Sequence, residues 1–160
     1  MICNEFLTSN CTPSCTKNHK CIKSYDNRKY ITCEEKRKKY ILENVRSVNI
    51  ANYHIDGGVV QNDDEKKCDF LIYVEDDKKI ILVELKGTEF STALKQLYNT
   101  VNLFSQQFNG NKIYARIVGK EVPKIANSPD AVKLIKLLKK YGGNLKSNSD
   151  VLSEKETQLA

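Results

Sequence analysis

The stretch CDFLIYVEDDKKIILVELKG, residues 68–87, contains two apolar runs separated by a short acidic segment. Runs of Leu, Ile, Val and Tyr of this length are typical of buried β-strands, and the Asp-Asp pair between them predicts a turn. The two strands are therefore expected to form an antiparallel hairpin. Because both runs are apolar at successive positions, both faces of the hairpin should be covered by other elements.

Three charged residues lie at one end of this predicted hairpin. Side chains alternate across a strand, so Glu84 and Lys86 leave the same face, while Asp69 begins the preceding strand. An antiparallel hairpin brings the start of one strand beside the end of the next, so the three residues should meet. Two carboxylates are costly to bury without a partner, and their hard oxygen atoms suit Mg²⁺ or Mn²⁺. A solvated sheet edge is the alternative explanation.

The segments before the hairpin predict a helix and a strand. Residues 33–47, CEEKRKKYILENVRS, have acids near the start and bases along the body, which favours a helix with Tyr40, Ile41 and Val45 on its buried side. Residues 48–58, VNIANYHIDGG, predict a strand that ends at two glycines. Asp56 is interpreted mainly as a turn residue, although it could also lie near the carboxylates. His54 is interpreted as structural.

The segments after the hairpin predict two helices and two strands. Apolar residues from Phe90 to Phe108 recur every three or four positions, which predicts a helix that ends before Asn109-Gly110. Gln96 lies off that apolar side and could face the carboxylates. Residues 111–119 predict a strand, and residues 128–143 predict a helix with Ser128 as N-cap, followed by Gly142. The tail, residues 143–160, predicts a short edge strand and then a frayed end.

The charged residues and the order α-β-β-β-α-β together resemble the PD-(D/E)XK nuclease superfamily, which has the restriction-endonuclease-like fold. The matching positions are Asp69 for the first acid, Glu84 for the second, Lys86 for the lysine and Gln96 for a frequent glutamine of the following helix. The resemblance runs from about Asp56 to Thr100 and departs from the family name at Cys68, where that name has proline. It implies an α/β fold, a mixed sheet with helices on both faces.

Another glutamate is often present in such proteins, in the helix before the first strand. The candidates here are Glu34, Glu35 and Glu43, and the sequence does not choose among them.

The resemblance implies an Mg²⁺- or Mn²⁺-dependent endonuclease that hydrolyses phosphodiester bonds, with DNA favoured over RNA, in a defence or repair system. Asp69, Glu84 and the Leu85 carbonyl would hold the metal. Lys86 would orient the attacking water and stabilise the developing charge, and Gln96 would position the water or a phosphate oxygen. A homodimer that cuts both strands is a further implication. The alternatives are a non-catalytic nucleic-acid-binding or protein-interaction module on the same fold, and a zinc-stabilised adaptor with a protein partner.

Length and composition suggest one domain with an appended segment. The chain has 160 residues and a net charge of +6, and we expect a cysteine-containing arm or small subdomain over residues 1–33 and the nuclease-like domain over residues 34–160. Four cysteines of the arm could bind zinc, or they could be free thiols: Cys3, Cys11, Cys15 and Cys21. Cys68 is interpreted as a small buried apolar residue.

Basic residues predict a surface for phosphate groups. Lys133, Lys136 and Lys140 recur at steps of three and four, so they form one stripe on the last predicted helix. A second group lies near the beginning: Lys17, Lys20, Lys23, Arg28 and Lys29. Neither group contains an evident base-reading element. The absence of an apolar span and of a signal-peptide pattern predicts a cytoplasmic protein without a membrane partner.

Overall fold

The structure, a computed structural model, describes residues 6–8, 21–60, 67–86, 89–120 and 128–159. Its strands are β1 (Ile22–Asp26), β2 (Tyr30–Glu35), β3 (Lys38–Glu43), β4 (Ile50–His54), β5 (Phe70–Val74), β6 (Lys79–Lys86), β7 (Lys112–Gly119), β8 (Leu145–Ser149) and β9 (Val151–Lys155). The helices are the short η1 (Glu75–Asp77), α1 (Phe90–Leu103) and α2 (Pro129–Lys140). None of the described helices is long and apolar enough to cross a membrane.

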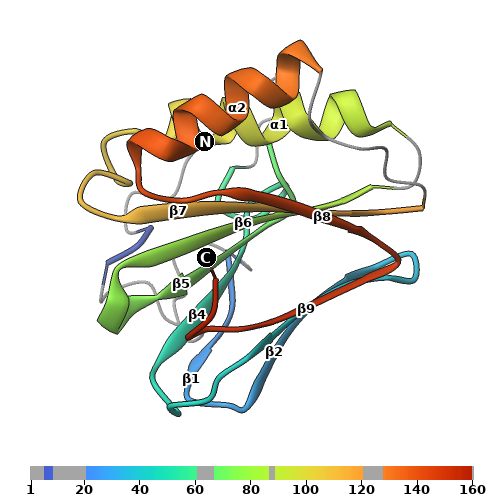
Figure 1. Ribbon diagram of the computed structural model, residues 1–160. Coiled ribbons are helices and arrows are strands. Elements are labelled where there is room, and N and C mark those ends of the chain that lie inside the picture. The colour runs from blue at the N-terminus through green and yellow to red at the C-terminus, as the bar shows by residue number, and fades with distance from the viewer. Residues whose placement is uncertain (1–5, 9–20, 61–66, 87–88, 121–127, 160) are drawn as a thin grey trace.

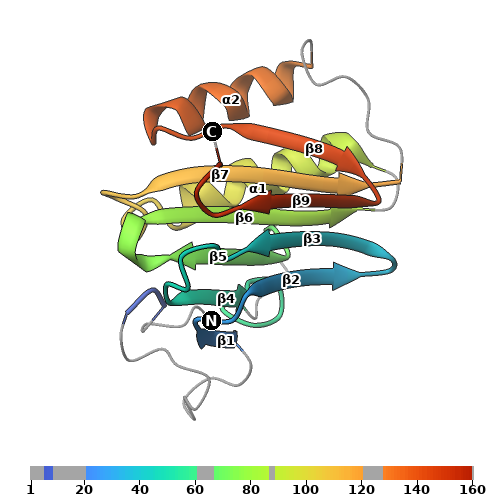
Figure 2. The same ribbon diagram turned by 60° about the horizontal axis from the view of Figure 1, so that its bottom comes forward.

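The strands form two sheets. The larger has six strands in the order β1-β4-β5-β6-β7-β8, and the smaller has three in the order β2-β3-β9. In the larger sheet the pairs from β1 to β6 are antiparallel, whereas β6, β7 and β8 are parallel to one another. The predicted mixed α/β architecture is therefore confirmed. Both long helices cover one face of the large sheet, and the small sheet lies against the other (Figures 1 and 2).

The large sheet is buried on both faces because its central strands are apolar at successive positions. In β6, Ile80 and Leu82 pack on the side of the helices, while Ile81 and Val83 pack on the side of the small sheet. The predicted covering of both faces is correct. The prediction of helices on both faces is wrong, since the small sheet covers the second face.

Most elements after residue 48 agree with the predictions. The β5–β6 hairpin is antiparallel, with Phe70 opposite Val83. Helix α2 has Ser128 at its N-cap and Pro129 at its first position. Helix α1 ends at Leu103, five residues before the end of the predicted apolar pattern at Phe108.

The predicted helix over residues 33–47 is wrong, because this segment belongs to the antiparallel β2–β3 hairpin. Its burial follows a period of two: Cys33, Tyr40 and Leu42 are buried, whereas Val45 is 53% exposed. The turn consists of Lys36 and Arg37, both in the left-handed region with φ of 47° and 67°. Burial of alternate side chains against the large sheet outweighs the helix propensity of the charged residues.

The two ends of the chain contribute more strand than predicted. Strand β1 belongs to the large sheet, and the expected boundary between residues 33 and 34 falls inside β2. The predicted edge strand in the tail is present as β8. Fraying after it is wrong, because β9 pairs with β3 and Leu159 is buried.

Candidate functional site

Asp69 and Glu84 meet where β5 begins and β6 ends. The backbone N–H of Asp69 donates to Glu84 Oε2 at 3.1 Å, and Asp69 Oδ2 accepts from the N–H of Leu85 at 2.9 Å. Each carboxylate is thus held by the backbone of the neighbouring strand. Glu84 is fully buried on the helix side of β6, and Asp69 is half-buried. The predicted convergence of these two residues is present.

Pairing within the sheet fixes the direction of the backbone N–H and C=O groups at the end of β6. Leu85 donates its N–H toward Asp69, and the N–H and C=O of one strand residue point to the same side. The Leu85 carbonyl therefore points toward β5 and the two carboxylates. Lys86 is the last residue of β6 and pairs with Gly119 of β7. Its side chain lies outside the described part of the structure.

A side-chain hydrogen bond joins helix α1 to Cys68, the residue before Asp69. Thr100 Oγ1 accepts from the N–H of Cys68 at 2.9 Å and donates to the carbonyl of Gln96 at 2.7 Å. Gln96 lies one turn before Thr100 on the same side of α1, toward the end of the sheet that carries Asp69. Its Oε1 is buried and has no hydrogen-bond partner among the described residues. A buried acceptor in this position suits a bound water or ligand.

Cys68 is fully buried beside the carboxylates, as its interpretation as a small apolar residue requires. Burial raises the pKa of its thiol well above the usual value, and the negative charge of Glu84 raises it further. The thiol therefore stays protonated and electrically neutral at physiological pH.

His54 is the last residue of β4, the strand beside β5, and Asp56 follows two residues later. Asp56 precedes a turn at Gly57, which has φ of +85°, and it pairs with Lys67 at 3.5 Å. The turn interpretation of Asp56 therefore agrees with the structure. The ring centroid of His54 lies 5.5 Å from that of Phe70, and burial followed by the charge of Lys23 lowers its pKa. The imidazole is therefore neutral at pH 7, which is consistent with a structural role.

The other predicted site residues are more dispersed. Glu34 and Glu35 end β2, and Glu43 ends β3 at the opposite end of that hairpin, so the three do not form one group. Cys21 is buried next to β1, and its carbonyl accepts from the N–H of His54 at 2.8 Å. Cys3, Cys11 and Cys15 lie outside the described residues, as do Lys17 and Lys20. The zinc site of the arm stays a prediction.

The lysine stripe of α2 is exposed but leads away from the carboxylates. Helix α2 follows the end of β7 and runs back over the sheet, so Lys140 lies at the end far from Glu84 (Figure 1). Lys133 is nearest to the carboxylate end, with its Nζ 4.3 Å from the ring centroid of Tyr98. Lys133 also lines a hollow of about 310 Å³ between α1 and α2. Binding of nucleic acid by Lys133, Lys136 and Lys140 stays a prediction.

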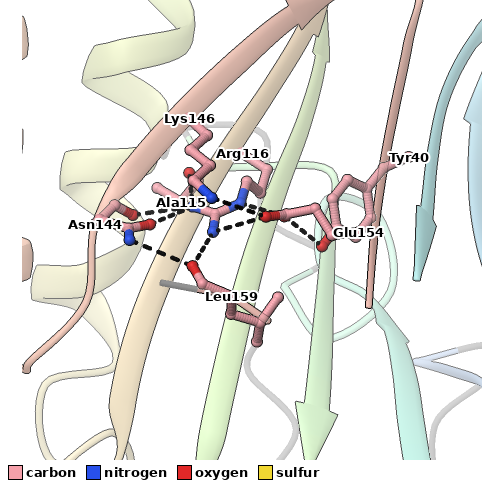
Figure 3. Close-up of polar contacts among 7 residues, drawn as sticks. All are labelled: Tyr40, Ala115, Arg116, Asn144, Lys146, Glu154 and Leu159. Carbon is pink, nitrogen blue, oxygen red and sulfur yellow. Dashed lines mark hydrogen bonds and ion pairs between the residues drawn. The ribbon is translucent and has the colours of Figure 1, made fainter. Parts of the chain in front are cut away.

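A second buried group of charges, centred on Arg116 of β7, was not predicted from the sequence. Arg116 is fully buried between the two sheets, and Nε and Nη2 donate to the two oxygens of Glu154 at 2.5 and 3.2 Å (Figure 3). Nη1 donates to Asn144, and Nη2 also donates to the carbonyl of Leu159. Tyr40 donates to Glu154 as well. The signal in the sequence was a single basic residue within the apolar run IYARIVG, residues 113–119.

The carboxylate end of the sheet has a donor set that fits a hard divalent cation. Among the described residues no three His, Cys, Asp or Glu side chains form a metal-binding group, and the acidic groups at this end of the sheet are the pair Asp69 and Glu84. Mg²⁺ commonly binds through one or two carboxylates together with water and phosphate oxygens. The Leu85 carbonyl adds a further hard oxygen directed to this place. The residues present therefore fit such an ion.

Comparisons of the chain with models of protein families, with curated proteins and with solved structures found no match. What the chain does must therefore be inferred from the residues at this end of the sheet. The chemistry available there is that of two backbone-held carboxylates, a strand carbonyl and a buried amide oxygen. All four belong to adjacent elements of the large sheet and its helix.

Proposed function

We propose that the chain is a metal-dependent nuclease of the PD-(D/E)XK type that hydrolyses phosphodiester bonds, with DNA as the preferred substrate. The observation that carries the proposal is the pair of hydrogen bonds that joins Asp69 and Glu84 across the ends of β5 and β6. Neighbouring like charges are unfavourable in a buried place, and such arrangements concentrate at functional sites.

The order of elements around the pair supports the proposal. Strands β4, β5 and β6 form an antiparallel meander, α1 follows, and β7 lies parallel to β6. This is the β-β-β-α-β part of the order that the resemblance implies, with the acids at the expected strand ends. A β-hairpin, β2–β3, stands where the resemblance implies the first helix.

Each residue would have a separate role. Asp69 and Glu84, with the Leu85 carbonyl, would hold the divalent ion, which when bound polarises the scissile phosphate and lowers the pKa of a water molecule. The backbone bonds of the two carboxylates keep their oxygens in place before any ligand arrives. Gln96 would orient the attacking water through its buried Oε1. Lys86 would stabilise negative charge on the phosphate, a role that is inferred from its position in the sequence, two residues after Glu84.

Cleavage of labelled DNA and RNA by the purified chain with Mg²⁺ or Mn²⁺ tests the proposal. Glu84→Gln and Asp69→Asn should each lower the rate by about a hundredfold or more, because charge stabilisation at the reacting phosphate is lost. Asp76→Asn is a matched control, since Asp76 is an exposed acid of η1 at the opposite end of the hairpin.

Native protein that binds these substrates but cleaves none of them would instead support the non-catalytic binding module. A homodimer stays a prediction, which sedimentation of the same preparation would test.

A further inference from the structure

The turn between β2 and β3 has an unusual composition for its conformation. Lys36 and Arg37 both have positive φ, the arrangement of a two-residue hairpin turn that Asn-Gly normally fills. Residues with a Cβ adopt this conformation at a cost in free energy. Two long basic side chains therefore occupy positions that the fold alone would assign to smaller residues. A costly local conformation that carries charged side chains is a reason to look for a ligand.

Hydrogen bonds connect this turn to the end of the large sheet that carries the two carboxylates. Lys86 pairs with Gly119, and the carbonyl of Gly119 accepts from the N–H of Asp150 at 2.8 Å. The carbonyl of Asp150 in turn accepts from the N–H of Lys39 at 2.9 Å. This path from Lys86 to Lys39 has three steps of strand spacing, so the two backbone positions lie at most about 15 Å apart. In Figure 2 the β2–β3 turn lies on the same side as the arrowheads of β6 and β7.

The charges at the turn are only partly compensated. Lys38 pairs with Asp150 at 2.9 Å, and Lys39 pairs with Glu34 at 3.7 Å. Lys36 and Arg37 are exposed and form no ion pair with any described residue. Two positive charges therefore project from the tip, beyond the paired charges at the base of the hairpin.

A further base lies on the same side of the large sheet. Nζ of Lys23 in β1 lies 4.9 Å from the ring centroid of Phe70, the residue after Asp69. Burial raises the pKa of the Cys33 thiol to about 12, and the positive charge of Lys23 opposes that rise. Burial and then Lys23 lower the pKa of His54, while Asp56 and Glu35, the latter at the base of the turn, act on His54 in the opposite sense. His54 therefore lies within electrostatic reach of both Lys23 and the base of the turn.

We propose that the tip formed by Lys36 and Arg37 binds the sugar–phosphate backbone of the nucleic acid that the Asp69–Glu84 site acts on. This inference rests on the proposed function. The path of about 15 Å from Lys86 to Lys39 corresponds to roughly four steps along one nucleic-acid strand at 3.4 Å each, and the tip lies two to three residues beyond Lys39. The tip would therefore contact phosphates a few nucleotides away from the scissile bond. Contacts of this kind position a substrate without reading its sequence.

Binding to a labelled DNA duplex of about 20 base pairs, measured by fluorescence anisotropy with Ca²⁺ across a salt series, tests the inference. The variant Lys36→Asn/Arg37→Gly removes both charges and supplies the residues that the turn prefers, so it should fold at least as well as the native chain. Two lost phosphate contacts should reduce the slope of log affinity against log salt by about 1.8. Between about 50 and 200 mM salt, native binding should then weaken about tenfold more than that of the variant.

Lys78→Asn is the matched control for Lys36→Asn. Lys78 is also an exposed lysine with positive φ, 51°, but it lies in the β5–β6 turn at the opposite end of the sheet. It should leave the salt slope unchanged, whereas Lys36→Asn should lower it by about 0.9. If the native chain binds nucleic acid and all variants have the same salt slope, the role of the tip is overturned but the proposed function is not. Failure of the native chain to bind DNA or RNA would overturn the proposed function as well. The inference would also be overturned if the turn variant bound nucleic acid as the native chain does but had lost binding to phosphatidylserine vesicles.

Discussion

Two charged groups lie on neighbouring strands of the large sheet. One pairs a base with an acid, and the other brings two acids together. Arg116 of β7 faces the small sheet and is matched by the opposite charge of Glu154. Glu84 of β6 faces the helices and is joined to Asp69, which has the same charge. Both Arg116 and Glu84 are fully buried.

The difference separates a structural role from the functional role that we propose. Opposite charges with saturated hydrogen bonds hold two sheets in register, and removal of one partner leaves a buried charge without compensation. Like charges cannot be explained in that way, because their proximity opposes folding. A group that the fold does not need for its stability points to a ligand of opposite charge. Three stability experiments can test this contrast.

The largest expected effect belongs to Arg116→Met. The free energy of unfolding should fall by about 3–5 kcal/mol, because the buried Glu154 side chain would lose its guanidinium and keep only the partly exposed Lys146, 3.5 Å away. Urea denaturation at pH 7 measures the loss. Arg116→Met/Glu154→Leu should recover much of it, since neither charge then remains. A loss below about 1 kcal/mol for the single variant would mean that the pair does not join the sheets.

Tyr40→Phe should have a smaller effect at pH 7, about 1 kcal/mol, from the lost hydrogen bond to Glu154. Burial, and then the charge of Glu154, raise the pKa of Tyr40 well above its usual value near 10. Above pH 10 the unfolded chain therefore releases a proton that the native chain keeps, so native stability falls as the pH rises.

The Phe variant lacks this proton, and its disadvantage should shrink by up to about 1.4 kcal/mol per pH unit above pH 10. Denaturation of both proteins at a series of alkaline pH values measures the shrinkage. A constant difference across that series would contradict the raised pKa.

The smallest expected effect on stability belongs to Glu84→Gln. The amide can still accept from the N–H of Asp69, and the change removes one of two neighbouring negative charges. The free energy of unfolding should therefore change by less than about 1 kcal/mol, even though Glu84 is as deeply buried as Arg116. The denaturation series that is used for Arg116→Met gives the comparison. A loss of several kcal/mol would assign Glu84 to the structural group.

The central part of the fold was predictable because its signals are local. The apolar runs and the Asp-Asp turn indicate the β5–β6 hairpin, and the antiparallel pairing then brings Asp69 and Glu84 together. Helix α2 was predictable from Ser128, Pro129 and the apolar period. The position of Gln96 was also predictable locally, because the apolar period of the helix directly after β6 shows which side of that helix Gln96 occupies.

The remaining parts depend on contacts that no local pattern contains. Residues 33–47 have strong helix formers, and their strand conformation comes from burial of Cys33 and Tyr40 against a sheet formed later in the chain. Arg116 and Glu154 are 38 residues apart, so nothing near either residue indicates the other. Strand β9 was missed for the same reason, since its partner β3 lies more than 100 residues earlier.

The pairing of β9 with β3 has a consequence for synthesis of the chain. Strands β2 and β3 are made early, but the small sheet and the partner of Arg116 are complete only after residues 151–159 have been added. A chain interrupted before Glu154 would contain both Asp69 and Glu84 and yet leave the guanidinium of Arg116 without its carboxylate partner. Such fragments should be recognised by proteases as unfolded. Translation through Leu159 is thereby a condition for a stable product.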